Sequence, residues 1–268
     1  MLTGWLAQGL DARRVVVIEP YPSDEISALV TKGVRLNPSP TEGAVATLVI
    51  ALKPQSFREA GATLKSFVGS STLAVSIMAG TTIASISEVC GGSVVRAMPN
   101  TPAAIGRGIT VAVAAKSVSA AQRAVADALL RATGSVEWID DENLMDAVTA
   151  VSGSGPAYIF LLAEELARAG VEAGLPPELA TRLARETVAG SGELLHRSDA
   201  PSATLRQNVT SPGGTTAAAL EVLMGPDGMQ SLLTRAVAAA TRRSKELAKE
   251  FSRPSMPRAP DAAQRAAS

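Results

Sequence analysis

The segment NVTSPGGTTAAALEVL (208–223) combines two adjacent glycines with several hydroxyl side chains. The glycines permit backbone conformations that are closed to other residues, and the hydroxyls lie where helical periodicity begins. Backbone N–H groups at a helix N-terminus, together with hydroxyls, bind anions. The segment therefore predicts a site of carboxylate size, although a plain connection between two helices would use the same residues. The residues concerned are Ser211, Gly213, Gly214, Thr215 and Thr216.

A second segment, VSGSGPAYIF (151–160), also has the composition of an anion site. Its small residues predict a tight turn, and Pro156 suits the first turn of a helix, where its missing N–H costs nothing. Free N–H groups at such a helix start attract anions. A capped turn between two domains explains the segment equally well. A hydrolase nucleophile elbow is excluded because glycines flank Ser154 directly.

Three further segments follow predicted strands: ALKPQ (51–55), MAG (78–80) and RAMPNTP (96–102). In an open parallel sheet, ligands bind outside the carboxyl ends of the strands. A single proline or glycine there would simply end a strand. Three such ends in one sheet predict a crevice for a cofactor.

A sheet and helices must position these segments. Predicted strands and helices alternate before residue 142, which predicts a parallel sheet, whereas no strand is expected from residue 142 onward. We expect a dinucleotide-binding α/β domain over 1–141, a helical domain over 142–251 and a disordered tail over 252–268. Strands are predicted at 15–19, 34–36, 46–52, 71–80, 93–102, 108–115 and 135–140. Helices are predicted at 23–33, 57–68, 81–90, 119–133, 157–174, 177–197, 201–209, 215–225 and 229–251.

The composition excludes several classes of function. Lysine plus arginine (25) balances aspartate plus glutamate (25), so charge gives no reason to expect nucleic acid or a membrane as partner. Cys90 is the only cysteine, which excludes an intramolecular disulfide and, without a secretory signal, predicts a cytoplasmic protein. His196 is the only histidine, which excludes a histidine-rich metal site and argues against a serine–histidine triad.

Taken together, LRQNVTSPGGTTAAALEVL (205–223), DAVTAVSGSGPAYIF (146–160) and VVRAMPNTP (94–102) resemble the pyrroline-5-carboxylate reductases, which complete proline synthesis. The segments occur in the order and spacing of that family, and VTSPGGTT is its specific signature. The similarity runs from Met1 to about Phe251, and the tail has no counterpart.

The resemblance implies a Rossmann-type N-terminal domain, an all-α dimerisation domain, and a homodimer or homodecamer. It implies reduction of a small cyclic imine to proline, with NADP or NAD in the reduced form as hydride donor and no metal. The cofactor residues that it implies are Ala51, Lys53, Pro54, Ala79, Gly80, Met98, Pro99, Asn100 and Asn208. The substrate residues that it implies are Ser211, Gly213, Gly214, Thr215 and Thr216 around the carboxylate and Thr149 facing the ring nitrogen, with Thr216 and Thr149 as catalytic candidates.

The choice between the two cofactors stays open. Glu19 ends the second strand of the presumed nucleotide-binding unit, where an acid accepts hydrogen bonds from ribose hydroxyls and repels a 2′-phosphate. That position favours NAD. Tyr21 and Ser23 follow in the next turn and offer a phosphate two hydroxyl donors, but no arginine is placed there.

Two other functions compete with the reductase. A relative of the 3-hydroxyacid dehydrogenases would share the fold, but it needs a lysine or histidine in the helical domain. No lysine lies between Lys116 and Lys245, and His196 stands at an expected helix end, where a solvated or capping role is typical. The other alternative is an inactive helical oligomerisation module that carries a damaged nucleotide domain.

The beginning of the chain departs from the family pattern. The family starts with a strand and a G-x-G-x-x-G-like loop, followed by a helix that ends in sequence like MLTGWLAQGL (1–10). That strand and loop do not precede this segment here. We therefore expect an open strand position with two exposed edges and no backbone cradle for the pyrophosphate. A start codon assigned too late explains this better than a truncated product, because the downstream site residues are intact.

Titration of the 268-residue chain with NADPH tests this expectation. We expect weak binding by this chain and tight binding by a version extended upstream, because the extension restores backbone N–H groups for the pyrophosphate. Binding of equal, high affinity by the two versions contradicts the prediction.

Overall fold

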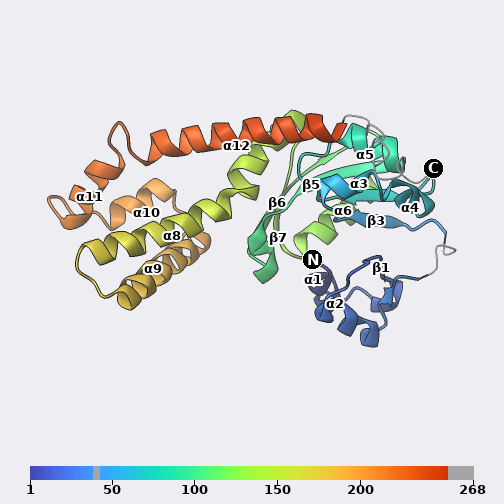
Figure 1. The fold of residues 1–268 in the computed structure, drawn as a ribbon, viewed down its shortest axis with the longest axis horizontal. Helices are drawn as coiled ribbons and strands as arrows, with labels where there is room; N and C mark the ends of the chain where they lie inside the picture. Colours follow the sequence, from blue (N-terminus) through green and yellow to red (C-terminus); the bar gives the residue numbers. More distant parts are fainter. Residues whose placement is uncertain (39–42, 253–268) are drawn as a thin grey trace, which may run out of the picture. The chain divides into compact units, whose positions relative to one another are not determined.

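A computed structural model of the chain describes residues 1–38 and 43–252 (Figure 1). Apart from Ser252, which ends the last helix, the predicted tail at 252–268 lies outside the described residues. The strands are β1 (Val16–Val17), β2 (Arg35–Leu36), β3 (Thr47–Ile50), β4 (Leu73–Ser76), β5 (Ser93–Met98), β6 (Gly108–Ala114) and β7 (Gly134–Trp138). The α-helices of the first half are α1 (Leu2–Ala7), α2 (Asp24–Leu29), α3 (Pro54–Phe57), α4 (Gly61–Ser66), α5 (Ile83–Cys90) and α6 (Ala120–Arg131).

From residue 142 onward the described part of the chain contains helices and no strand, as predicted from its 3.6-residue periodicity. A short π-helix, η6, lies between the first two of its α-helices. The elements are α7 (Met145–Val148), η6 (Thr149–Gly153), α8 (Gly155–Glu172), α9 (Pro177–Arg197), α10 (Ser202–Asn208), α11 (Thr215–Leu223) and α12 (Met229–Ser252).

Contacts between Cα atoms divide the chain into two compact units. Among the described residues, the helix-rich unit contains Met1–Leu10, Met98–Ala112 and Asp127–Arg242, and the sheet-rich unit contains Asp11–Ala97, Val113–Ala126 and residues 243–252. The predicted sequential division at residue 141 stays a prediction.

The sheet arrangement explains where the chain exposes its strand edges. Five strands form one sheet in the order β3-β4-β5-β6-β7, and β1 and β2 form a separate two-stranded sheet. The pairs β1–β2, β3–β4, β4–β5 and β6–β7 are parallel, as the alternation of strands and helices predicts. Among the described residues, β3 is therefore an end strand of the five-stranded sheet. The expectation of two exposed edges stays a prediction.

The end position of β3 explains its partial burial. The segment 46–52 is a continuous apolar run, which predicts a strand covered on both faces. In the structure only Ile50 is buried, whereas Leu48 and Val49 are half-buried. An edge strand lacks a neighbour on one side, so its side chains keep part of their contact with water.

Helix ends follow their sequence signals in some places and depart from them in others. The sequence predicts that Ser23 caps the helix over 23–33, that Gly33 ends it, and that Thr81 caps the helix over 81–90. The first two predictions are confirmed: Ser23 accepts a hydrogen bond from Ile26 N at the start of α2, and Gly33 ends the following helical turn in the left-handed conformation. The prediction for Thr81 is wrong, because Thr82 accepts from Ser85 N at the start of α5. The predicted helix over 57–68 is confirmed for α4 (Gly61–Ser66) but not over its first turn. A separate short helix, α3, ends at Phe57 and begins at Pro54, which has no N–H to satisfy.

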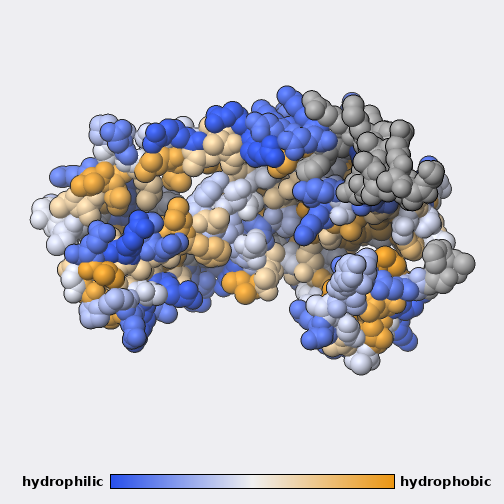
Figure 2. Space-filling view, viewed as in Figure 1, coloured by the Kyte–Doolittle hydropathy of each residue, from blue (hydrophilic) through white to orange (hydrophobic). Residues whose placement is uncertain are grey.

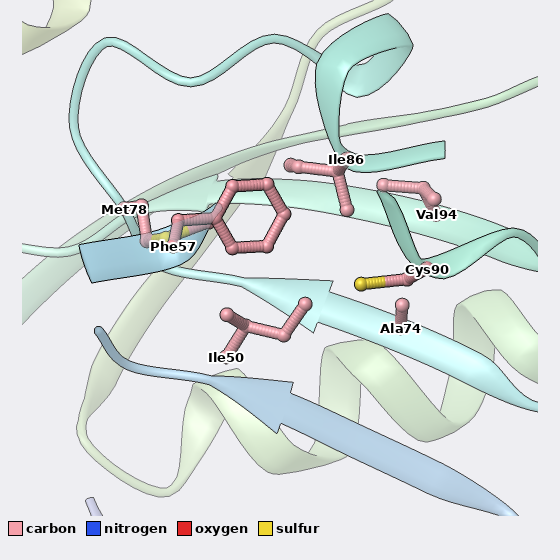
Figure 3. Packing of buried hydrophobic residues seen from close by; sticks show 7 residues of the cluster. All are labelled: Ile50, Phe57, Ala74, Met78, Ile86, Cys90 and Val94. Atoms are coloured by element: carbon pink, nitrogen blue, oxygen red, sulfur yellow. The ribbon is translucent and has the colours of Figure 1, made fainter. Parts of the chain in front are cut away.

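A cluster of buried side chains in the sheet-rich unit packs α3 and α5 against β3, β4 and β5 (Figure 3). Cys90 belongs to this cluster and is only 2% exposed. Burial raises the pKa of its thiol to about 11, so the thiol stays protonated at neutral pH. Cys90 is therefore a core residue rather than a nucleophile. The cluster consists of Ile50, Phe57, Ala74, Met78, Ile86, Cys90 and Val94.

A pair of glycines starts the β6–β7 ladder in the helix-rich unit. Gly108 and Gly134 lie opposite each other in the parallel register, and Gly134 has φ +144°. A Cβ atom added at Gly134 would lie 1.9 Å from Gly108 O. The backbones of β6 and β7 are therefore too close together here for any side chain at residue 134.

Replacement of Gly134 by alanine tests this close approach. We expect Gly134→Ala to lower the free energy of unfolding by at least about 3 kcal/mol, because the backbone of β6 must move away. Gly106→Ala is the matched control, since Gly106 also has a left-handed φ (+71°) but has no atom within 4 Å of an added Cβ. It should lose only about 1–2 kcal/mol. Equal losses for the two variants in denaturant unfolding would show that φ alone sets the requirement.

Candidate functional site

The glycine–hydroxyl segment forms the entry to α11 in the helix-rich unit. Gly213 has φ +68°, a conformation that favours glycine, and Gly214 N donates to Ser211 O (3.0 Å). Gly214 is the N-cap of α11, and no side chain caps the helix end. Ser211, Gly213 and Thr215 are exposed, whereas Thr216 is half-buried. The N-terminus of α11 is thus open to an anion, with hydroxyl groups on both sides of the glycines.

The other residue proposed from the same region, Asn208, is exposed at the end of α10. Five residues separate it from Gly214 along the chain, so that it belongs to the same connection between α10 and α11. Its amide is available to a ligand on the surface of this unit.

The predicted tight turn around Ser154 is wrong. Residues Thr149–Gly153 form the π-helix η6, which leads into α8, with Pro156 in the first turn of α8. Ser154 N donates to Thr149 O (2.8 Å), so this N–H is not available to an anion. Tyr158 Oη donates to the carbonyl of Ala150 (3.0 Å), a residue with no exposed surface, and so satisfies a buried acceptor in the widened turn. Short π-helices of this kind occur frequently at functional sites.

Thr149 begins η6 and is half-buried. Its hydroxyl donates to Met145 O (2.8 Å). A hydroxyl has one proton, so this bond leaves Thr149 Oγ1 with lone pairs only. Toward a ligand, Thr149 is therefore a hydrogen-bond acceptor.

The turn after β5 lies against η6 within the helix-rich unit. Met98, Pro99 and Asn100 are half-buried. A Cβ atom added at Gly153 would lie 2.4 Å from the terminal methyl of Met98, which places the two segments in direct contact. Asn100 Nδ2 also donates to Ser152 Oγ (3.4 Å). The structure thus brings three of the proposed cofactor residues beside the segment that contains Thr149.

The remaining cofactor candidates at strand ends lie in the sheet-rich unit. Strands β3 and β4 pair up to Ile50 and Ser76, and Ile77 N donates to Ile50 O (3.1 Å). Parallel pairing therefore puts the residues that follow both strands at the same edge. Ala51 and Lys53 are exposed there, Pro54 and Ala79 are half-buried, and Gly80 is buried with φ +67°.

Glu19 follows β1 and is half-buried. Its Oε1 accepts from Tyr21 N (3.0 Å), which leaves the other carboxylate oxygen for a ligand hydroxyl. The side chain of Asn37 accepts from Glu19 N and donates to Glu19 O (both 2.8 Å), and these bonds fix the backbone at that position. Tyr21, whose hydroxyl was considered as a phosphate donor, is 91% exposed.

The lone histidine belongs to a cluster that its sequence context did not reveal. His196 Nε2 contacts Arg107 Nη1, and Arg107 Nη2 donates to Glu193 Oε1 (3.2 Å). Arg197 donates to the same oxygen (2.6 Å), and with Arg107 it lowers the pKa of Glu193. A guanidinium cannot accept, so His196 Nε2 is the acceptor in this contact. The cluster borders a hollow of about 510 Å³ lined by Gly106, Arg107, Gly108, Ile109, Arg131, Gly134, Ser135 and His196.

Two absences limit the chemistry of the described residues. They contain no group of three or more histidine, cysteine, aspartate or glutamate side chains placed to hold a metal ion. They also contain no helix that is long and apolar enough to cross a lipid bilayer.

A largely parallel sheet with cofactor candidates at its strand ends, followed by a helical region with a glycine–hydroxyl site, defines a Rossmann-type oxidoreductase with a helical second domain. A sequence model described as "Pyrroline-5-carboxylate reductase dimerisation" matches residues 142–247. The pyrroline-5-carboxylate reductase of Synechocystis sp. is 42% identical over 241 residues, covering 88% of each chain. That of Pseudomonas aeruginosa is 39% identical over 256 residues, covering 94% of this chain and 93% of its own.

Solved structures agree with the sequence comparisons. A pyrroline-5-carboxylate reductase from Coxiella burnetii has a TM-score of 0.80 at 34% identity and covers 92% of this chain and 93% of that one. The Plasmodium falciparum pyrroline carboxylate reductase, solved with NADP bound, has a TM-score of 0.75 at 30% identity and covers 91% and 92% of the two chains. The chain belongs to the pyrroline-5-carboxylate reductase family.

Proposed function

We propose that this chain reduces 1-pyrroline-5-carboxylate to proline with a nicotinamide dinucleotide. Membership of the family supports the reaction. The observation that carries the assignment of the site is the uncapped N-terminus of α11, which follows a left-handed glycine and is flanked by hydroxyls. That arrangement suits the substrate carboxylate. We assign carboxylate binding to Ser211, Gly213, Gly214, Thr215 and Thr216.

The reaction needs positioning more than it needs a strong acid. The reduced nicotinamide, when bound, supplies the hydride that the imine carbon accepts. A protonated imine is already a good electrophile, and it has one N–H to donate. Thr149 Oγ1 is restricted to accepting because its proton is held by Met145 O, so it suits that N–H. Orientation of this kind contributes several kcal/mol to catalysis.

The cofactor residues fit a dinucleotide as two groups. Ala51, Lys53, Pro54, Ala79 and Gly80 surround the common edge of β3 and β4, where nucleotide ligands bind in such sheets. The turn Met98–Asn100 lies beside η6. We assign Met98 and Pro99 of this turn to contacts with the nicotinamide end, with Asn208 as an additional contact. Within residues 1–38 and 43–252, no hydrogen bond engages the second carboxylate oxygen of Glu19, which supports NAD over NADP as the preferred donor.

Thr216→Ala tests the carboxylate assignment. Loss of a hydrogen bond to a charged group costs about 1.5–3 kcal/mol, so we expect KM for pyrroline-5-carboxylate to rise about 10- to 100-fold. The dissociation constant of the dinucleotide, measured by fluorescence titration, should stay within about twofold. Thr216→Ser keeps the hydroxyl and is the matched control. A similar loss of both affinities in Thr216→Ala would remove Thr216 from the substrate site.

We also propose a homodimer, or a homodecamer built from such dimers, that forms through residues 142–251. The match of residues 142–247 to a dimerisation model supports self-association of this part. Figure 2 shows apolar patches over α8 to α11, and large side chains there are exposed in a single chain. Examples are Phe160 (67% exposed), Leu194 (68%) and Val222 (77%). Exposed apolar surface of this extent is typical of an interface. The cytoplasmic location stays a prediction.

The mass in solution, measured by light scattering, tests the interface. We expect a multiple of 27.4 kDa for the unchanged chain. Phe160→Glu combined with Leu194→Glu should shift the mass toward a single chain, because a charge in an apolar interface is costly to bury. Ile105→Glu is the control, since Ile105 is 78% exposed but lies outside the matched residues. A single-chain mass for the unchanged protein, or an unchanged mass for the double variant, would contradict the proposal.

A further inference from the structure

The side-chain amide of Asn100 connects three segments of the helix-rich unit. Its Oδ1 accepts from Ile109 N (3.0 Å), and its Nδ2 donates to Ser152 Oγ (3.4 Å). Asn100 itself follows β5, Ile109 is the second residue of β6, and Ser152 lies in η6. One amide thus holds the turn after β5, the start of β6 and the π-helix at a single point.

The orientation of this amide follows from the chemistry of its partners. A backbone N–H only donates, so Asn100 must present its oxygen to Ile109 and its NH₂ group to Ser152. Both ends of the amide are then engaged by the protein. A direct hydrogen bond to a dinucleotide would have to use the second N–H of Nδ2 or the second lone pair of Oδ1.

We propose that Asn100 is a positioning residue that holds η6 against the turn Met98–Asn100 and thereby fixes Thr149 relative to the nicotinamide end of the site. The proposal rests on the proposed reductase function. Packing supports the same contact, because Gly153 lies against the methyl of Met98 without room for a Cβ. The π-helix is a rare form of helix, and a hydrogen bond from outside η6, such as that from Asn100 to Ser152, helps to hold η6 in this form.

The position of Thr149 depends on η6 through the backbone. Thr149 is the first residue of η6, and its carbonyl accepts from Ser154 N across the whole π-turn. A shift of η6 toward ordinary α-helix would rotate Thr149 and move its acceptor lone pairs. A misplacement of about 1 Å at a reacting group costs about 100-fold in rate. Asn100 therefore affects turnover through Thr149 rather than through affinity for the dinucleotide.

A double-mutant cycle on the full chain tests the proposal. We expect Asn100→Ala and Ser152→Ala each to lower kcat for pyrroline-5-carboxylate about 10-fold, and the double variant to lose no more than either single variant. The dissociation constant of NADPH should change less than about twofold in all three. Asn100→Asp keeps an acceptor for Ile109 N and can accept from the Ser152 hydroxyl, so it should recover part of the loss. Asn143→Ala removes an exposed amide that bonds only to Asp141 within its own turn, and it should leave kcat unchanged.

The same cycle read by denaturant unfolding separates this proposal from the proposed function. Non-additive losses of unfolding free energy in the two single variants would support the Asn100–Ser152 contact even if the chain has no reductase activity. Additive losses of stability would overturn the proposal. Weakened NADPH binding by Asn100→Ala with unchanged kcat would also overturn it, because that result identifies Asn100 as a cofactor contact.

Discussion

Parallel pairing of β3, β4 and β5 is the constraint on which the α/β part depends. Their registers, from Thr47↔Leu73 to Ser76↔Arg96, run the three strands in one direction. Every strand must then deliver its following loop to the same edge, and every return must cross a face of the sheet. Strand pairing alone therefore places the residues after β3 beside those after β4, and no direct interaction between the two loops is needed. A small, glycine-containing loop is enough to form the proposed cofactor site there, because the sheet already determines where the loop lies.

In the proposed reaction, the helical part has a different task, which is to hold a small charged imine without a titrating side chain. The proposed carboxylate site consists of backbone N–H groups and hydroxyls, whose charge does not depend on pH near neutrality. The hydroxyl of Thr149 is made an acceptor by its bond to Met145 O, so its role is set by geometry rather than by protonation. The one histidine accepts from Arg107, and the one cysteine is protonated in the core. These two side chains, which titrate most readily near neutral pH in other proteins, are thus engaged elsewhere.

Structural features that depend on residues close in sequence could be predicted, whereas features that depend on residues far apart in sequence could not. Ser23 and Gly33 bound their helix as expected, because capping and left-handed glycine act within one turn. The π-helix at 149–153 was missed because one extra residue per turn leaves almost no trace in hydrophobic periodicity. The half-burial of Val49 depends on the missing neighbour of β3, and the bond from Asn100 to Ser152 joins residues 52 positions apart. No local pattern records either of these.

Side chains of the sheet are more deeply buried in a single chain than those of helices α8, α9 and α11. This difference raises the question of which contacts stabilise the helices. The interior strand β4 has all its residues buried, whereas α8 and α11 have no buried residue in the described chain, and α9 has only Ala180 and Ala184. Isolated helices of this length are marginal in water, and most of their stability comes from packing of an apolar face. Contacts between α8 and α9 supply some packing, but Phe160 and Leu194 stay outside it. Association between copies, which the match to a dimerisation model supports, would bury such side chains and make the stability of the helical part depend on protein concentration.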